Sequence, residues 1–260
     1  MVALLGSGNV ATWLATRLRD SQEFPVTQVY SRRLEHARVV ADMCGAEAID
    51  DLSRLDSHCG VYIFALSDDA LPQVLPQIPF RMPLAVHTAG SVPQEIFRPY
   101  ADHYGVLYPL QTFSKTADMS ALQVPLCVEC DQAGPCRERL LSLAEALSDT
   151  VRPLSGEQRF YAHLASVFAC NFSNAMCQVA DQILQQHQLD RSLILPLLEQ
   201  TVHKLQGMSP REAQTGPARR GDEEVMRHHL AALSDPRWRE IYRLMSDFIR
   251  QEAQSDADSQ

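Results

Sequence analysis

The chain has 260 residues, of which 45% are hydrophobic and 21% charged, so it contains enough apolar material for one large or two modest domains. Its net charge of −9 argues against a nucleic-acid-binding protein, because affinity for phosphates requires clustered Lys and Arg. No apolar run approaches the roughly 18 residues that span a bilayer, and no basic leader precedes the opening MVALLGSG. We therefore expect a soluble, cytoplasmic protein without membrane or nucleic-acid partners.

Short apolar runs alternate with amphipathic helices through the first part of the chain. The pattern predicts strands at residues 2–5, 26–30, 60–66, 84–86, 105–107 and 126–128, and helices over 10–18, through Arg38 to Cys44, and over 135–147. The run Gly60–Leu66 is apolar throughout, as in a strand buried on both faces of a parallel sheet. This alternation predicts an α/β fold: a Rossmann-type, doubly wound parallel sheet over residues 1–152.

A G-x-G-x-x-A motif follows the first predicted strand, as GSGNVA at residues 6–11. Gly6 permits a tight turn, Gly8 lets the backbone approach a pyrophosphate, and Ala11 lets helix and strand pack closely. Backbone N–H groups at the helix start would face the phosphates. The motif predicts a dinucleotide site; the alternative is a glycine turn without a ligand. The predicted cofactor-binding residues here are Gly6, Ser7, Gly8, Asn9 and Val10.

The end of the second predicted strand distinguishes NADP from NAD. An NAD site is expected to place Asp or Glu about 20 residues past the motif, where it holds the ribose. This chain has Ser31, Arg32 and Arg33 there instead. A guanidinium makes paired, charge-assisted hydrogen bonds to a phosphate. We therefore predict NADP, held by Ser31 and Arg32; alternatively, the two arginines begin a solvated helix.

Ligands of open α/β sheets bind beyond the carboxyl ends of the strands, and two further segments fall there. Ala65, Leu66 and Ser67 follow one strand, and His87–Ser91 follows the next. We predict that the first segment and Thr88 contact the cofactor, that Ser91 contacts substrate, and that His87 donates a proton. A structural, hydrogen-bonded histidine is the alternative for His87.

The strand pattern ends near Val151, which predicts an all-α C-terminal domain over 153–250 and a disordered acidic tail over 251–260. Ser155 and Gln158 have the spacing of a capping box that opens a long helix. Further helices are expected over 192–206, 223–233 and 237–249, with a breaker-rich loop over 208–222.

Polar side chains of this domain complete the candidate site. On the long helix, His163 and Asn174 are 11 residues apart and share one face, and Asn171 lies close to that face. We predict catalytic roles for His163 and Asn171, although neighbouring helices could equally satisfy these groups. The predicted substrate contacts here are Asn174, Lys204, Thr215 and Arg220.

The seven cysteines are scattered and odd in number, which favours reduced thiols over a disulfide framework. Cys127 and Cys130 have C-x-x-C spacing, but a four-cysteine zinc site requires a second such pair, and none exists. The histidines show no metal spacing with a third ligand. We predict no metal site.

The long helix from Ser155 carries apolar residues on more than one stripe, including Tyr161, Leu164, Val167 and Phe168. A helix that is apolar over most of its circumference is normally buried on several sides. We expect a homodimer formed through the helical domain. The alternative is a monomer in which the sheet domain covers the surplus face.

Taken together, several segments resemble the bacterial Rossmann-like proteins that carry a helical C-terminal domain of unknown function and are described as NADP oxidoreductases. The segments are LLGSGNVA (4–11), VYSRR (29–33), HTAGSVP (87–93), YPLQTFS (108–114), HLASVFACNFSN (163–174) and QTGPARRGD (214–222). More distantly, the chain is similar to pyrroline-5-carboxylate reductase, the deazaflavin-dependent NADP reductases and the 6-phosphogluconate and hydroxyisobutyrate dehydrogenases.

The hydroxyacid dehydrogenases of that group place a catalytic lysine on the first long helix, but residues 155–186 contain no lysine here. The resemblance therefore implies an NADP-dependent oxidoreductase acting on a small carbonyl, imine or hydroxy compound between the two domains. The alternative is a non-catalytic dinucleotide-binding or sensor protein whose helical domain serves for dimerisation.

Overall fold

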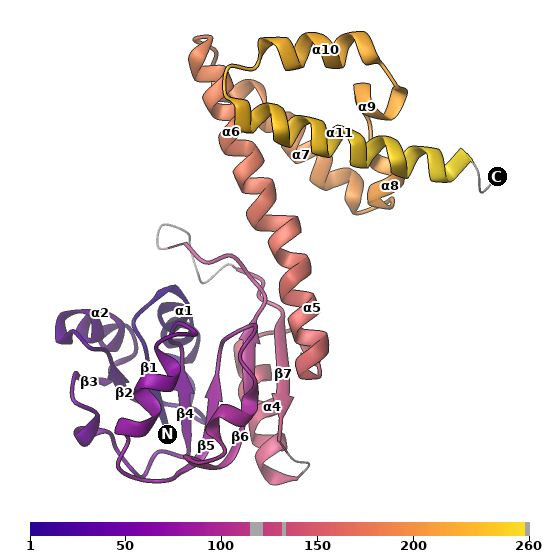
Figure 1. Ribbon diagram of the computed structural model, residues 1–260. Coiled ribbons are helices and arrows are strands. Elements are labelled where there is room, and N and C mark those ends of the chain that lie inside the picture. The colour runs from indigo at the N-terminus through magenta and orange to yellow at the C-terminus, as the bar shows by residue number, and fades with distance from the viewer. Residues whose placement is uncertain (115–121, 132–133, 258–260) are drawn as a thin grey trace. The chain divides into compact units, whose positions relative to one another are not determined.

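The computed structural model describes residues 1–114, 122–131 and 134–257, and the chain divides into two compact units, Met1–Asn171 and Phe172–Gln260. The first unit contains an eight-stranded sheet in the order β3-β2-β1-β4-β5-β6-β7-β8 (Figure 1). The strands are β1 (Val2–Leu5), β2 (Val26–Tyr30), β3 (Glu47–Ile49), β4 (Val61–Phe64), β5 (Met82–His87), β6 (Ala101–Pro109), β7 (Leu126–Cys130) and β8 (Val151–Pro153). Strands β1 to β6 pair in parallel, β7 is antiparallel to β6, and β8 is parallel to β7. The predicted Rossmann-type α/β fold is confirmed.

Helices cover both faces of this sheet because its strand side chains alternate between the two faces. Val2 and Leu4 join a core with α1 (Asn9–Leu18), α2 (Leu34–Cys44) and α4 (Pro135–Leu147). Ala3 and Leu5 join a second core on the opposite face. That face is covered by α3 (Leu71–Val74) and the 3-10 turns η1 (Leu52–Arg54), η2 (Leu75–Gln77) and η3 (Gln94–Phe97).

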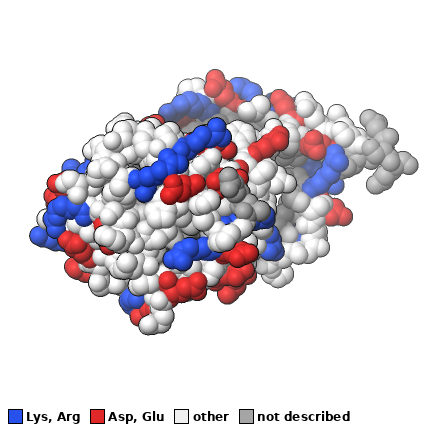
Figure 2. Space-filling model, turned by 90° about the horizontal axis from the view of Figure 1, so that it is seen from below, with Lys and Arg blue, Asp and Glu red and all other residues white. Residues whose placement is uncertain are grey.

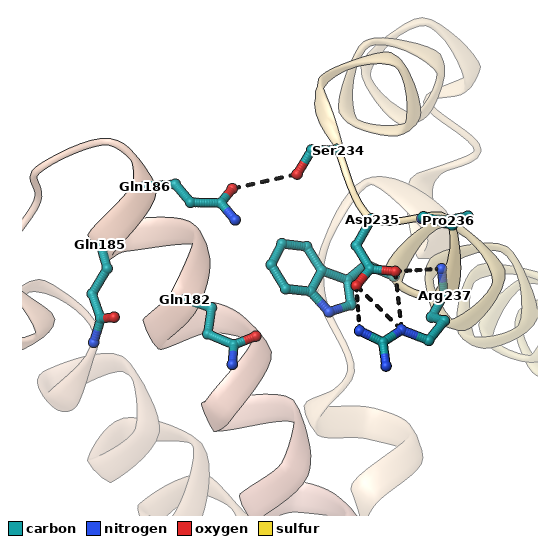
Figure 3. A pocket seen from close by; sticks show the side chains of 8 residues that line it. Gln182, Gln185, Gln186, Ser234, Asp235, Pro236 and Arg237 are labelled. Carbon is teal, nitrogen blue, oxygen red and sulfur yellow. Dashed lines mark hydrogen bonds and ion pairs between the residues drawn. The ribbon is translucent and has the colours of Figure 1, made fainter.

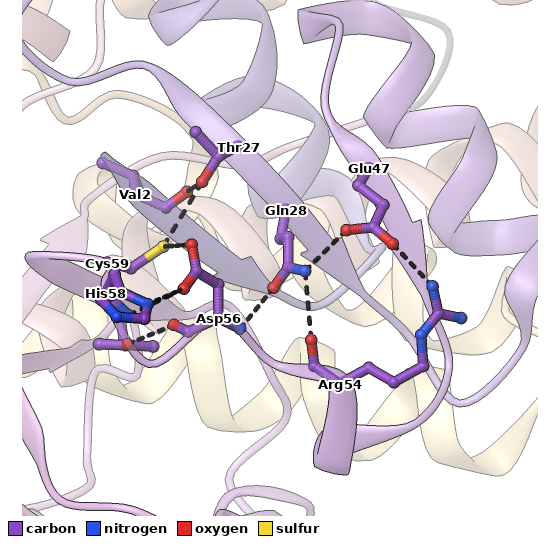
Figure 4. Close-up of polar contacts among 9 residues, drawn as sticks. Val2, Thr27, Gln28, Glu47, Arg54, Asp56, His58 and Cys59 are labelled. Atoms are coloured by element: carbon purple, nitrogen blue, oxygen red, sulfur yellow. Dashed lines mark hydrogen bonds and ion pairs between the residues drawn. The ribbon is translucent and has the colours of Figure 1, made fainter.

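The sequence did not predict the short strands β3 and β8, each of three residues. Such runs are too short to show an alternating pattern, and pairing with a neighbour is what makes them strands. At β3, side chains reinforce that pairing: the Gln28 amide donates to Glu47 (2.8 Å), and Arg54 donates to Glu47 (2.7 Å) (Figure 4). The Gln28 side chain also accepts a hydrogen bond from the backbone N–H of Asp56 (2.8 Å), which holds the turn at Asp56 against β2.

The long helix begins as predicted, at the capping box of Ser155 and Gln158. It runs as α5 (Gly156–Ser166), a π-helical segment (Val167–Phe172) and α6 (Ser173–Gln186). The two compact units divide within this helix, between Asn171 and Phe172. The predicted domain boundary at residues 152 and 153 stays a prediction. Helical periodicity predicts a helix but not which part of the protein the helix packs against. Here Arg159 of α5 donates hydrogen bonds to the backbone after β5, so α5 belongs with the sheet.

The second unit is helical throughout its described length, with elements α6, η5 (Arg191–Leu193), α7 (Leu195–Leu205), α8 (Pro210–Ala213), α9 (Pro217–Arg220), α10 (Glu223–Ala232) and α11 (Pro236–Ala257). The segment predicted as a loop over 208–222 contains α8 and α9, because Pro210 and Pro217 occupy first helical positions, where proline is favoured. The predicted disordered tail is helical over 251–257, and residues 258–260 lie outside the described residues.

No helix within the described residues has the length and apolarity needed to cross a bilayer. Acidic and basic side chains are interspersed on the face shown in Figure 2, and no broad basic area forms there. That face therefore lacks the clustered positive charge that nucleic-acid binding requires.

Candidate functional site

The glycine motif forms a tight turn between β1 and α1. Gly6 has φ +133°, and a Cβ atom there would overlap the carbonyl oxygen of Ala65 in the segment after β4. Gly8 has extended backbone angles (φ −82°, ψ −172°), and a Cβ atom there would meet nothing within 4 Å. Ala11, in the first turn of α1, is fully buried. The turn is thus packed at Gly6 and open at Gly8, the position where a dinucleotide motif needs space for phosphate.

Side chains of the turn tie it to its neighbours. The hydroxyl groups of Ser7 and Ser31 lie 2.9 Å apart, which joins the turn to the end of β2. The Asn9 amide donates to the carbonyl of Phe113 (2.9 Å) after β6. Arg32 is exposed and forms no ion pair with any described residue, so its guanidinium is available to an anion.

The ends of β4 and β5 bring the remaining predicted cofactor residues to the same edge of the sheet. The backbone N–H of Ala65 donates to Leu5 (2.8 Å), and that of Thr88 donates to Phe64 (3.2 Å). Thr88 is almost buried, the side chains of Val10, Ala65 and Leu66 are half-buried, and Ser67 is exposed. The parallel register therefore gathers these residues beside the glycine turn, and their contact with a cofactor stays a prediction.

His87 does not lie where a proton donor must. Its side chain is fully buried, packs on Phe97 with ring centroids 5.6 Å apart, and accepts from the backbone N–H of Ala89 (3.2 Å). Burial, together with the nearby positive charge of Arg159, lowers the pKa of His87 from 6.5 to about 4. The imidazole is neutral at pH 7 and shielded from substrate, so the predicted catalytic role gives way to the structural alternative.

This burial makes stability depend on pH. Between pH 6.5 and about 4 the unfolded chain binds a proton at His87 that the folded chain does not, so the free energy of unfolding falls as pH falls. We expect His87 to account for up to about 3 kcal/mol of that loss. Urea unfolding of the parent and of His87→Gln, each at pH 6.5 and at about pH 4, measures how much of the lost free energy of unfolding His87 causes. An equal loss in both proteins would contradict the assignment.

A buried arginine, which sequence analysis missed, holds the segment after β5. Arg159 is 2% exposed and donates to the carbonyl oxygens of Ala89 (3.0 Å), Gly90 (2.8 Å) and Val92 (2.9 Å). It also pairs with the Glu129 carboxylate (3.0 Å) on β7. The sequence carries no sign of this role, because an arginine in the first turn of a helix is usually solvated. The clamp fixes the backbone that carries Thr88 and Ser91.

Beside this clamp, Tyr108 and His163 form a polar pair. The Tyr108 hydroxyl lies 2.8 Å from His163 Nδ1, and the two rings meet edge to face. A Cβ atom at Gly90 would come within 2.8 Å of the His163 ring, so glycine permits this close approach. Burial raises the pKa of Tyr108, which therefore keeps its proton at neutral pH. Ser91, a predicted substrate contact, is exposed and donates to the Asp68 carboxylate (2.7 Å).

Tyr108 stands at the carboxyl end of β6, so the rule that selected His87–Ser91 could have found it. The predicted site residues instead came from the ends of β4 and β5, and Tyr108 lies only in the resemblance segment YPLQTFS.

The π-helical segment changes how the long helix presents its polar residues. Each π turn contains more residues than an α turn, because its hydrogen bonds join residues five apart. The π-helical segment spans Val167–Phe172, so the spacing of an α-helix does not hold between His163 and Asn171. Both asparagines are exposed. A π segment cannot be seen in hydrophobic periodicity, and such segments often occur at functional sites.

The other predicted substrate residues lie in the second unit. Lys204 is half-buried on α7, Arg220 is exposed at the end of α9, and Thr215 lines a largely apolar cavity of about 420 Å³. No hydrogen bond joins any of these to another among the described residues, so their roles stay a prediction. A more open groove of about 670 Å³ includes Gln182, Ser234 and Trp238, with Asp235 and Arg237 ion-paired at its rim (Figure 3).

Cys127, the first cysteine of the C-x-x-C pair, is not activated for redox chemistry. Cys127 is buried in β7, where burial raises the pKa of its thiol, whereas redox-active cysteines require a lowered one. Within the described ranges, no group of three His, Cys, Asp or Glu residues could hold a metal ion.

Comparisons with known proteins place this chain in a family. The model of a family described as "Domain of unknown function (DUF2520)" matches residues 124–249, and no curated protein matches the chain. A solved structure from Bacteroides fragilis, described as a "putative NADP oxidoreductase", is 38% identical, with a TM-score of 0.89 and coverage of 96% of this chain and 97% of that one.

Two more distant structures share the fold. A Thermotoga maritima protein is 22% identical, with a TM-score of 0.79 and coverage of 98% of this chain and 100% of that one. An imine reductase from Myxococcus stipitatus in complex with NADP+ is 14% identical, with a TM-score of 0.64 and coverage of 100% and 94%. The identity to the Bacteroides protein, over nearly both whole chains, is decisive: this chain belongs to the family of Rossmann-like proteins with a helical C-terminal domain of unknown function.

Proposed function

We propose that this protein is an NADP(H)-dependent oxidoreductase of a small carbonyl, imine or hydroxy compound. The observation that carries the proposal is the glycine turn, which is packed at Gly6, open at Gly8, and placed at the carboxyl edge of a parallel sheet. The family relative described as a "putative NADP oxidoreductase" and the imine reductase in complex with NADP+ support the same cofactor and reaction class.

The preference for NADP rests on the residues that follow β2. Ser31 is held beside the turn by Ser7, and the neighbouring Arg32 is exposed without an ion pair among the described residues. A hydroxyl and a guanidinium can both donate to a 2′-phosphate, whereas a carboxylate at this place would repel it.

Replacing Arg32 by alanine is expected to weaken NADPH binding about 10- to 100-fold, since charged hydrogen bonds contribute about 1.5–3 kcal/mol. NADH binding should change little, because it lacks the 2′-phosphate. Calorimetric titration of both cofactors measures the difference. Arg38→Ala is the matched control, since Arg38 is an exposed arginine on α2, the helix that begins just after Arg32 and Arg33. Equal affinity of the parent for NADPH and NADH would refute the NADP preference.

We infer that Tyr108 and His163 supply the proton of the reduction. When bound, the reduced nicotinamide supplies a hydride to the carbon of a C=O or C=N bond. The oxygen or nitrogen of that bond must gain a proton. The Tyr108 hydroxyl is protonated at neutral pH, as an ordinary phenol is and more so because burial raises its pKa, and it can supply that proton. The O–H bond of Tyr108 breaks as the new bond to hydrogen forms. His163, 2.8 Å away, then returns a proton from solvent to the phenolate.

A panel of carbonyl, imine and hydroxyacid compounds tests the activity directly. NADPH oxidation with a carbonyl or imine, or NADP reduction with a hydroxy compound, is expected for one chemical class. NADPH binding without turnover of any member would favour a dinucleotide-binding protein without reductase activity. The titration above is independent of turnover, so it separates failure of cofactor binding from failure of the substrate class.

A further inference from the structure

The backbone of Gly90 lies directly against the hydrogen bond between Tyr108 and His163. A Cβ atom at Gly90 would come within 2.8 Å of His163 Nδ1 and 3.1 Å of Tyr108 Cζ. Nδ1 is the atom that shares a hydrogen with the tyrosine hydroxyl (2.8 Å), and Cζ is the ring carbon that carries this hydroxyl. Both distances are shorter than the usual separation of atoms in contact. The position of Gly90 therefore limits where the two rings can lie.

Arg159 in turn determines where Gly90 lies. Its Nη1 donates to the carbonyl oxygens of Ala89 (3.0 Å) and Gly90 (2.8 Å). Its Nη2 donates to the carbonyl of Val92 (2.9 Å) and to the carboxylate of Glu129 (3.0 Å). The planar guanidinium thus holds four acceptors in one fixed arrangement, which a single ammonium group does not reproduce. The backbone at Gly90 cannot move without breaking this arrangement.

The strand register and the helix bring all of these groups to one place. Glu129 on β7 pairs with Val106, two residues before Tyr108 on β6. Because cross-strand partners share a face, as do residues two apart, Glu129 and Tyr108 project from the same side of the sheet. Arg159 and His163 are four residues apart on α5, so they share one side of that helix. One helix therefore carries both the clamp and half of the polar pair.

The burial of this clamp indicates a geometric role. Arg159 is 2% exposed, and its partner Glu129 is largely buried. A buried ion pair is a weak source of stability, because withdrawing two charges from water can cost more than their attraction returns. We propose that Arg159, oriented by Glu129, is a positioning residue: through the Gly90 backbone it fixes the hydrogen bond between Tyr108 and His163. This inference rests on the proposed function, in which that pair supplies the proton.

Nuclear magnetic resonance of the full-length protein, with isotope-labelled histidine, tests the geometry without cofactor or substrate. The Nδ1 resonance of His163 is identified by its loss in His163→Gln, and Tyr108→Phe shows its position when the hydrogen bond is absent. We expect Gly90→Ala and Arg159→Lys each to move the resonance toward the Tyr108→Phe position. The first adds a methyl group against Nδ1, and the second keeps the charge but removes the guanidinium fork.

Gly60→Ala and Arg54→Lys are the matched controls. A Cβ atom at Gly60 would have the flexible end of the Arg139 side chain as its nearest neighbour (3.1 Å). Arg54 is also paired with a glutamate, Glu47 (2.7 Å), but beside β3, at the other end of the sheet. Both variants should leave the His163 resonance where the parent has it.

Turnover gives the second measurement, with whichever compound of the panel the parent reduces. Arg159→Lys and Gly90→Ala are expected to lower kcat on the order of ten- to a hundredfold, since a small misplacement of a catalytic group has effects of that size. NADPH affinity should fall far less than kcat. A merely structural clamp would instead lower the midpoint of unfolding of Arg159→Lys and leave kcat of the folded protein at the parent value.

The resonance must move in both variants. A shift in Gly90→Ala alone would overturn the role of Arg159, and a shift in Arg159→Lys alone would overturn the route through Gly90. If Arg159→Lys does not fold, Glu129→Gln takes its place, because it keeps an acceptor for the guanidinium but removes the charge that orients it. Absence of turnover in the parent would contradict the proposed function, whereas the resonance would still decide the positioning.

Discussion

Replacing Gly8 by valine is expected to abolish NADPH binding while leaving the fold intact. Gly8 has extended backbone angles that any residue adopts, and a Cβ atom there would meet nothing within 4 Å. The folded chain therefore accommodates the side chain, at a cost of no more than about 1 kcal/mol at a helix N-cap. The added isopropyl group fills the space that a pyrophosphate would need. Calorimetry with NADPH and thermal unfolding of the same sample measure the two effects.

Gly6→Ala is the contrasting control in the same turn. Alanine at φ +133° is strained by about 1–3 kcal/mol, and its Cβ would also overlap the Ala65 carbonyl. We expect this smaller substitution to lower the midpoint of unfolding markedly, whereas the larger one at Gly8 does not. Retained NADPH binding by Gly8→Val would mean that the motif is only a turn and would remove the observation that carries the proposed function.

Replacing Tyr108 by phenylalanine is expected to lower kcat about a hundredfold or more, the usual contribution of a positioned general acid. The change removes one hydroxyl group and keeps the ring that lies against His163. NADPH affinity should be unchanged, because Tyr108 takes no part in the glycine turn. The measurement is NADPH oxidation with whichever compound of the panel the parent reduces, together with calorimetric titration of the cofactor.

Tyr104→Phe is the matched control, since Tyr104 is also half-buried on β6 and its hydroxyl contacts Arg98 (3.4 Å) instead of His163. Activity should fall less with His163→Leu than with Tyr108→Phe, because that variant loses the proton relay but keeps the phenol. Equal activity of Tyr108→Phe and the parent would exclude Tyr108 as the proton donor and leave the cofactor assignment untouched.

The glycine turn and the strands beside it could be predicted from the sequence because their signals are local. The spacing of Gly6, Gly8 and Ala11, the continuous apolar run of β4, and the arginines after β2 each lie within a few residues of one another. The backbone demands of a tight turn and the two-residue period of a strand act over the same short range, so they leave a readable pattern. The start of the long helix was predictable for the same reason, since Ser155 and Gln158 cap one turn.

The tertiary structure alone decided the roles of the buried polar groups. The same sequence pattern suits a catalytic or a structural His87. The two are distinguished by the burial of His87 in the folded chain and by the charge of Arg159, 72 positions later. The pairing of Tyr108 with His163 joins positions 55 residues apart, and the clamp of Arg159 joins positions about 70 apart. The electrostatic and hydrogen-bonding environment of a side chain is set by its neighbours in space. The order of residues along the chain does not show which distant residues become those neighbours when the chain folds.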